Sequence, residues 1–96
     1  MVTLSQIQKR RAEILNIAAS HGADNVRVFG SVVRDEAGPQ SDLDLLVRMS
    51  PKSSLLDRIA IKQDLEDLLG VSVDIVNEKA LHALIREKVL SEGVLL

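Results

Sequence analysis

The chain has 96 residues, of which 46% are hydrophobic and 27% charged, with a formal net charge of −2, so we expect one globular domain over residues 1–96 rather than a disordered chain. There is no cysteine, which excludes disulfides, thiolate zinc sites and cysteine nucleophiles, and neither a membrane-spanning run nor a signal peptide is visible, so we expect a cytoplasmic protein with no membrane partner. Phe29 is the only aromatic residue and the net charge is negative, so we expect no direct binding of nucleic acid.

Helices and strands alternate along the chain. In chain order we predict a helix, a strand, a short helical turn, a loop, a strand, a helix, a strand and a helix, over residues 4–21, 25–29, 31–36, 37–40, 42–49, 55–69, 71–76 and 78–91. Thr3, Ser54 and Asn77 are the expected N-caps, and Gly22 and Gly70 are the expected helix ends. Because only a short loop separates the first two strands and a helix separates the next two, we predict an α/β (α+β) fold, a small mixed β-sheet with helices packed on it.

Three aspartates lie within strands that are otherwise apolar. Side chains alternate along a strand, so Asp42 and Asp44 share one face, and Asp74 has the corresponding position in the third strand. Aspartate is a poor strand former. If the two strands are neighbours, the three carboxylates converge, and a divalent cation such as Mg²⁺ would relieve their repulsion. The alternative is that they are ordinary solvent-facing residues of an exposed sheet face.

A Gly-Ser pair marks the end of the first strand. Gly30 permits close approach of the backbone to a ligand, and the hydroxyl and free N–H groups around Ser31 can bind phosphate. On its own the pair indicates only a plain strand-to-helix turn with Ser31 as N-cap. Its value lies in the combination, because ten residues separate it from Asp42 and Asp44, and Asp74 follows on a later strand.

At these residues the chain resembles the minimal nucleotidyltransferases of the DNA polymerase beta superfamily. The family signature is Gly-Ser, about ten residues, Asp-x-Asp and a third acid on a later strand, which Gly30-Ser31, Asp42-Leu43-Asp44 and Asp74 match. The resemblance covers nearly the whole chain and implies a polymerase-beta-like fold. Many such small proteins are antitoxins that are paired with HEPN-type ribonuclease toxins.

The resemblance also implies a role for each matching residue. Gly30 and Ser31 would hold the triphosphate of ATP, and Asp42 and Asp44 would bind two Mg²⁺ ions. Asp74 would complete one metal site and help to deprotonate the acceptor hydroxyl.

An arginine is common in the family segment after Gly-Ser, so Arg34 would touch phosphate, whereas the alternative is a surface arginine paired with Asp35 or Glu36. Relatives often have glycine directly after that arginine, where this chain has Asp35.

The implied activity is transfer of AMP from ATP to a hydroxyl, that of a tyrosine, on a partner HEPN toxin, which makes the chain a type VII-like antitoxin. The sequence has no tyrosine, so the modified residue would lie in another chain. An alternative is a catalytically weak module that neutralises its partner by masking it. A third possibility is a nucleotidyltransferase subunit that modifies a small molecule. A homo-oligomer and a hetero-oligomer both stay open.

Surplus apolar residues indicate a partner or additional packing. The helix at 55–69 carries Leu55, Leu56 and Ile59 outside its main apolar stripe, either as an interface or because the helix is covered on two sides. The last helix has an apolar stripe of its own, and the apolar residues 93–96 could cover the sheet edge or dock on a partner. No role is assigned to His21 or His82.

Overall fold

The computed structural model describes residues 2–34, 36 and 42–96. In chain order its helices, 3₁₀ helices (η) and strands are α1 Leu4–Lys9, α2 Arg11–Ser20, β1 Ala23–Phe29, η1 Gly30–Val32, β2 Leu43–Met49, α3 Leu55–Leu69, β3 Val73–Asn77, η2 Glu78–Ala80, α4 Ala83–Glu92 and β4 Val94–Leu95. The strands form one four-stranded sheet in the order β3-β2-β1-β4. β1 is antiparallel to β2 and β4, and β2 is parallel to β3, so the predicted mixed sheet is confirmed.

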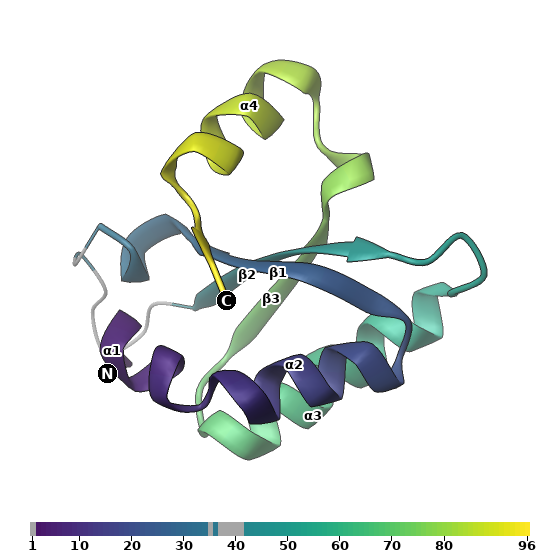
Figure 1. Ribbon diagram of the computed structural model, residues 1–96, viewed down its shortest axis with the longest axis horizontal. Coiled ribbons are helices and arrows are strands. Elements are labelled where there is room, and N and C mark those ends of the chain that lie inside the picture. The colour runs from purple at the N-terminus through teal and green to yellow at the C-terminus, as the bar shows by residue number, and fades with distance from the viewer. Residues whose placement is uncertain (1, 35, 37–41) are drawn as a thin grey trace.

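Helices lie on both faces of this sheet. α3 connects β2 to the parallel β3 in one direction across the sheet, and α4 leads from β3 back to β4 in the other. Because such crossovers are right-handed, reversing the direction places the two helices on opposite faces. Figure 1 shows α2 and α3 along one side of the sheet and α4 on the other.

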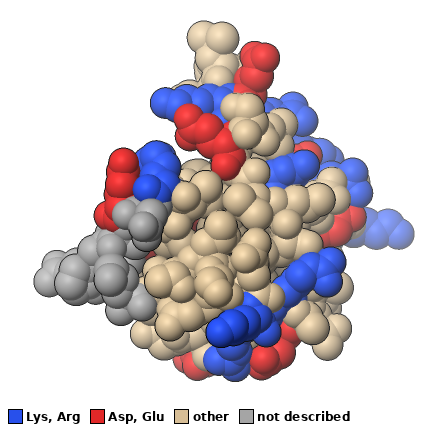
Figure 2. Space-filling view, turned by 60° about the vertical axis from the view of Figure 1, so that its left-hand side comes forward, with Lys and Arg blue, Asp and Glu red and all other residues tan. Residues whose placement is uncertain are grey.

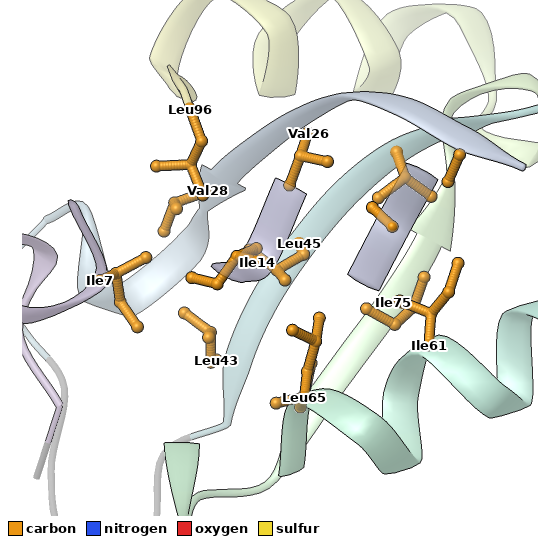
Figure 3. Packing of buried hydrophobic residues seen from close by; sticks show 14 of the residues in the cluster. Ile7, Ile14, Val26, Val28, Leu43, Leu45, Ile61, Leu65, Ile75 and Leu96 are labelled. Atoms are coloured by element: carbon orange, nitrogen blue, oxygen red, sulfur yellow. The ribbon is translucent and has the colours of Figure 1, made fainter. Parts of the chain in front are cut away.

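The hydrophobic core lies between the sheet and the pair α2 and α3. Alternate residues of β2 and β3 point into it, and we call this side of the two strands the core face; its members are Leu43, Leu45, Val47, Val73 and Ile75. Ile14 of α2 and Ile61 and Leu65 of α3 pack against them (Figure 3). All eight side chains are at most 4% exposed. The alternation predicted from the sequence therefore sets which face is buried.

The predicted helix over 4–21 is wrong in one respect, because it is broken at Arg10. The backbone of Arg10 is non-helical, with φ −104° and ψ 17°, and separates α1 from α2. The Arg10 guanidinium donates to the Glu13 carboxylate and to the Leu68 carbonyl oxygen at the end of α3. This long-range contact cannot be read from local spacing. The capping box of Thr3 and Gln6 is confirmed.

The prediction of one helix over 78–91 is also wrong. The Asn77 side chain accepts a hydrogen bond from the Lys79 N–H and caps the short η2, and α4 begins only at Ala83 with His82 as its N-cap. The apolar stripe predicted for this helix is not buried, since Leu84 is 74% and Ile85 57% exposed. α4 buries no residue in the described structure, and Figure 1 shows this helix standing away from the sheet.

The other strand and helix ends agree with prediction to within two residues, except that the helical turn predicted over 31–36 is η1, which ends at Val32. β1 begins earlier than expected and contains an irregularity in its pairing with β2, where Asn25 has φ +50°. The capping box of Ser54 at α3 is confirmed, and Gly70 ends that helix with φ +69°. The apolar C-terminal residues form β4, which pairs with β1 and covers the sheet edge. The loop predicted at 37–40 lies outside the described residues.

Candidate active site

The Gly30-Ser31 turn packs directly on β2. β1 ends at Phe29 and the chain passes at once into η1. Gly30 has φ +77°, a backbone conformation that side chains disfavour. A Cβ atom built on Gly30 would overlap the Asp44 carboxylate, whose Cγ lies 3.3 Å from that position. Glycine is therefore required both by the backbone and by the close approach of Asp44, so the turn and the aspartate belong to one site.

Asp44 and Asp74 are direct neighbours on adjacent strands. The register of the parallel pair β2 and β3 places the two aspartates opposite each other, and Phe29 is the partner of Asp44 on the β1 side. Asp74 is exposed and Asp44 half-buried, and the exposed Asp42 immediately precedes β2. We call this side of the sheet, the side of α4 in Figure 1, the carboxylate face. The predicted pairing of two strands through their aspartates is thus present.

The charges of Asp42 and Asp74 act on Asp44. Burial raises the pKa of Asp44, and repulsion from Asp74 and then from Asp42 raises it further, whereas Arg34 lowers it. Like charges that disfavour each other's ionised form are typical of sites that accept a cation or a proton. Asp44 is therefore close enough to Asp74 and Asp42 for their charges to disfavour its ionised form.

The described residues do not form a preassembled metal-binding cluster. Within residues 2–34, 36 and 42–96, no three histidine, aspartate or glutamate side chains are grouped so that they could hold one ion. The register of β2 and β3 places Asp44 opposite Asp74, and the Gly30 turn packs on Asp44. Hard carboxylate oxygens on rigid strands nevertheless form the donor set that suits Mg²⁺, which keeps part of its shell for water and phosphate oxygens.

Arg34 is bound to its neighbour in sequence. Its N–H donates to the Gly30 carbonyl oxygen over 3.3 Å, and its Nε lies 3.0 Å from the Glu36 carboxylate. The hydrogen bond to Glu36 is also the main reason why the pKa of Arg34 is raised, with smaller contributions from Glu92 and Asp44. The structure thus shows the predicted alternative, a surface arginine paired with Glu36. Asp35 lies outside the described residues.

Two side chains that sequence reasoning passed over secure the edge of β3 beside Asp74. The Glu66 carboxylate accepts from the Val73 N–H over 3.0 Å, and the Lys62 ammonium donates to the Val73 carbonyl oxygen over 2.6 Å. The contact with the Val73 N–H is the main reason why the pKa of Glu66 is lowered, followed by Lys62. The spacing of Lys62 and Glu66 predicts a helical ion pair. Their reach to β3 depends on tertiary packing.

A second polar pair, Glu78 and Arg86, lies beyond the end of β3. Glu78 in η2 is only 9% exposed, although glutamate is rarely buried, and an Arg86 nitrogen of α4 lies 3.9 Å from its carboxylate. η2 also packs against β2, where Leu46 is fully buried on the carboxylate face. No sequence signal distinguished Glu78 from an exposed helical acid.

Both histidines have structural roles. His21 Nε2 lies 3.1 Å from the Asp64 carboxylate, which ties the end of α2 to α3. His82 Nδ1 accepts from the Leu84 N–H at the start of α4. Arg11 donates from Nε to the Leu96 carbonyl oxygen and so holds the C-terminal segment against α2. None of these three residues belongs to the candidate site.

The surface carries charges of both signs. On the face shown in Figure 2, Lys and Arg together with Asp and Glu lie around the margin of an uncharged central area. Among the described residues, no helix combines the length and the apolar character needed to cross a membrane.

Comparison with known proteins identifies the family. The family model of the nucleotidyltransferase domain matches residues 11–96. Protein adenylyltransferase MntA of Thermococcus cleftensis is 39% identical over 95 residues, which are 98% of this chain and 96% of the relative. A Methanocaldococcus jannaschii protein that is provisionally named a protein adenylyltransferase is 35% identical over 92% of this chain and 95% of its own length.

Solved structures agree with this result. A protein described as a minimal nucleotidyltransferase superposes with a TM-score of 0.89 at 49% identity, covering 99% of this chain and 97% of the other. A chain of the complex between the tri-AMPylated HEPN toxin of Shewanella oneidensis and its MNT antitoxin superposes with a TM-score of 0.69. That likeness, at 19% identity over 92% of this chain and 69% of the other, shows the fold alone. The chain therefore belongs to the nucleotidyltransferase domain family, and it is a nucleotidyltransferase with the fold of the minimal members.

Proposed function

We propose that this chain transfers AMP from ATP to a hydroxyl, that of a tyrosine, on a partner protein of the HEPN type, and that it is the antitoxin of such a pair. The observation that carries the proposal is the packing of the Gly30 turn on Asp44, with Asp74 opposite on β3. The adenylyltransferase names of the relatives favour AMP as the transferred group. The complexes of HEPN toxin with MNT antitoxin favour a protein acceptor.

The proposed nucleotide site follows from the turn. Without a side chain at Gly30, the Asp44 carboxylate packs against the turn, so a triphosphate bound by the turn would lie beside that acid. The N–H groups at the start of η1 and the Ser31 hydroxyl would bind the triphosphate. For Arg34 to reach phosphate, it would exchange its contact with Glu36 for one with the nucleotide.

The proposed metal site uses Asp42, Asp44 and Asp74. Burial and then repulsion by Asp74 and Asp42 raise the pKa of Asp44, and bound Mg²⁺ would relieve the repulsion. When bound, two Mg²⁺ ions would supply charge neutralisation at the phosphates. In this arrangement Asp42 and Asp44 would face both ions, and Asp74 would face one of them and the acceptor.

The reaction itself is a single substitution at phosphorus. The acceptor oxygen attacks the α-phosphorus, the new oxygen–phosphorus bond forms, and the bond to the departing pyrophosphate breaks. The hydroxyl proton would pass to Asp74, which is exposed on β3 and therefore accessible to a group from another chain. Catalysis then consists of positioning and electrostatic stabilisation, without a covalent enzyme intermediate.

Mass spectrometry of the acceptor tests this proposal. The chain is incubated with ATP, Mg²⁺ and the HEPN protein encoded in the adjacent reading frame, and the intact mass of the HEPN protein should rise by one or more AMP units. Asp44→Asn should abolish the addition, whereas Asp67→Asn, an exposed acid on α3, should leave it unchanged. Absence of any HEPN reading frame beside this chain, or equal labelling by both variants, would contradict the proposal.

Masking is the second candidate, and the exposed apolar residues of α3 favour it, because they suit a surface that covers a partner. Cell protection separates the two candidates. If Asp44→Asn protects cells from the toxin as well as the wild-type chain does, neutralisation occurs by masking rather than by AMP transfer.

A further inference from the structure

α3 has a second apolar surface that the core does not use. Ile61 and Leu65 are buried in the core, whereas Leu55 is 59%, Leu56 75% and Ile59 39% exposed. We call these three exposed residues the α3 patch. A surface helix needs only one apolar stripe, and grouped exposed hydrophobic residues mark interaction surfaces.

The α3 patch adjoins the candidate active site through Ile59. A shallow groove of about 150 Å³ runs between α3 and the edge of β3, and its lining includes Ile59, Arg58 and Lys62 together with Asp74. A second groove of about 450 Å³ continues past Leu55 and Arg58 to Lys79. Asp74 can therefore be approached around the free edge of β3, from the side on which the α3 patch lies.

The grooves are bordered by positive charge. Arg58 and Lys79 form no ion pair within the described part of the chain, and Lys62 shares its ammonium group between Glu66 and the Val73 carbonyl oxygen. A partner surface that brings carboxylates to Arg58 and Lys79 would be complementary. The α3 patch therefore combines exposed apolar side chains with positive charge at its border.

The edge of β3 is closed to strand addition at its start. An edge strand can pair with an extended segment of another chain unless side chains block its free polar groups. Here the N–H and carbonyl of Val73 are already satisfied by Glu66 and Lys62. Strand addition is therefore blocked at Val73, next to Asp74, whereas side-chain contacts of the kind that the α3 patch offers are available there.

We propose that the α3 patch is the docking surface for the acceptor protein of the AMP transfer, an inference that rests on the proposed function. The fitting partner presents an apolar surface bordered by Asp or Glu carboxylates, and its acceptor hydroxyl reaches Asp74 around the edge of β3. The exposed residues of α4 are the competing surface, but Leu84 and Ile85 do not line either of these two grooves.

Two matched leucines test the docking. Leu56 and Leu84 are both in helices and are 75% and 74% exposed. The HEPN protein of the adjacent reading frame is titrated by calorimetry, without nucleotide, into the wild-type chain and into Leu56→Glu and Leu84→Glu. Leu56→Glu should weaken binding at least ~10-fold, as loss of a central apolar contact does, whereas Leu84→Glu should bind like wild type. Arg58→Glu should slow association and reduce its dependence on salt.

The outcomes separate the docking from the activity. Equal affinity of all variants, equal weakening by Leu56→Glu and Leu84→Glu, or no binding by wild type would overturn the docking surface. AMP transfer and ATP binding are measured on the same proteins. If AMP transfer occurs and Leu56→Glu binds the HEPN protein with wild-type affinity, the proposed function stands and the docking surface is wrong. Selective weakening by Leu56→Glu without any AMP transfer keeps the docking surface and removes the enzymatic proposal.

Discussion

The two faces of β2 and β3 differ in what their side chains contribute. On the core face, Leu43 and Leu45 are fully buried beneath α2 and α3. One residue away on the carboxylate face, Asp44 has a raised pKa because it is partly buried beside Asp74 and Asp42. The same backbone thus carries side chains that stabilise the fold on one face and side chains that repel one another on the other.

This difference teaches where stability and activity are separable. Because neighbouring positions of one strand point to opposite faces, a substitution on one face need not disturb the other. The core face should determine the free energy of unfolding, and the carboxylate face should determine nucleotide binding and transfer. Each prediction below would break or sharpen this division.

The largest effect is expected on the core face. Leu45→Ala should lower the free energy of unfolding by about 2–5 kcal/mol, because it leaves a cavity among tightly packed residues. Leu55→Ala, on the exposed side of α3, should change it by less than about 0.5 kcal/mol. Urea unfolding followed by circular dichroism measures both. Similar losses for the two variants would break the division.

Asp44→Asn should separate activity from stability. Transfer of AMP should fall ~100-fold or more, comparable to the loss of one electrostatic group in other active sites. The variant should nevertheless be at least as stable as wild type at pH 7, because burial and acidic neighbours raise the pKa of Asp44 and so disfavour its ionised form in the folded state.

The sign of this effect can be checked with pH. The pKa of Asp44 is higher in the folded than in the unfolded state, so the ionised carboxylate lowers the free energy of unfolding at neutral pH. This loss of stability is relieved as the pH falls through the raised pKa and Asp44 becomes protonated. The stability advantage of Asp44→Asn should therefore shrink between pH 7 and about pH 4. A wild-type protein that is more stable than Asp44→Asn at pH 7 would contradict the raised pKa.

Gly30→Ala should affect both properties, and Gly70→Ala provides a matched control. Both glycines have positive φ, +77° and +69°, so each alanine should cost roughly 1–2 kcal/mol in stability. A Cβ at Gly70 meets nothing within 4 Å, whereas one at Gly30 collides with Asp44. Only Gly30→Ala should therefore lose nucleotide binding in a fluorescent-ATP titration, and loss with both variants would point to general instability.

The smallest effect is expected for the ion pair between Arg34 and Glu36. Glu36→Gln should release Arg34 from its 3.0 Å contact and tighten ATP binding by about two- to fivefold, a modest gain because both side chains are exposed. Arg34→Gln should remove that gain when combined with Glu36→Gln. Unchanged affinity in the single variant would confine Arg34 to its surface pair.

The alternating strands and the buried side chains were predictable, because periodicity alone assigns Leu43 and Leu45 to the core face. The spacing of Gly30 and Asp44 predicted a shared site, but their contact depends on the register of β1 and β2, which Asn25 interrupts. The break at Arg10 depends on the Leu68 carbonyl, far away in sequence. Local patterns likewise could not show that α4 leaves Leu84 exposed, since burial depends on where a helix lies.

Calorimetric titration of ATP in the presence and absence of Mg²⁺ tests most directly whether Asp42, Asp44 and Asp74 form a nucleotide site beside Gly30. The wild-type chain should bind ATP with Mg²⁺, and Asp44→Asn and Asp74→Asn should each bind it at least ~10-fold more weakly. Asp67→Asn should bind like wild type. Wild-type protein that takes up no ATP with Mg²⁺, or aspartate variants that bind it with unchanged affinity, would contradict the site.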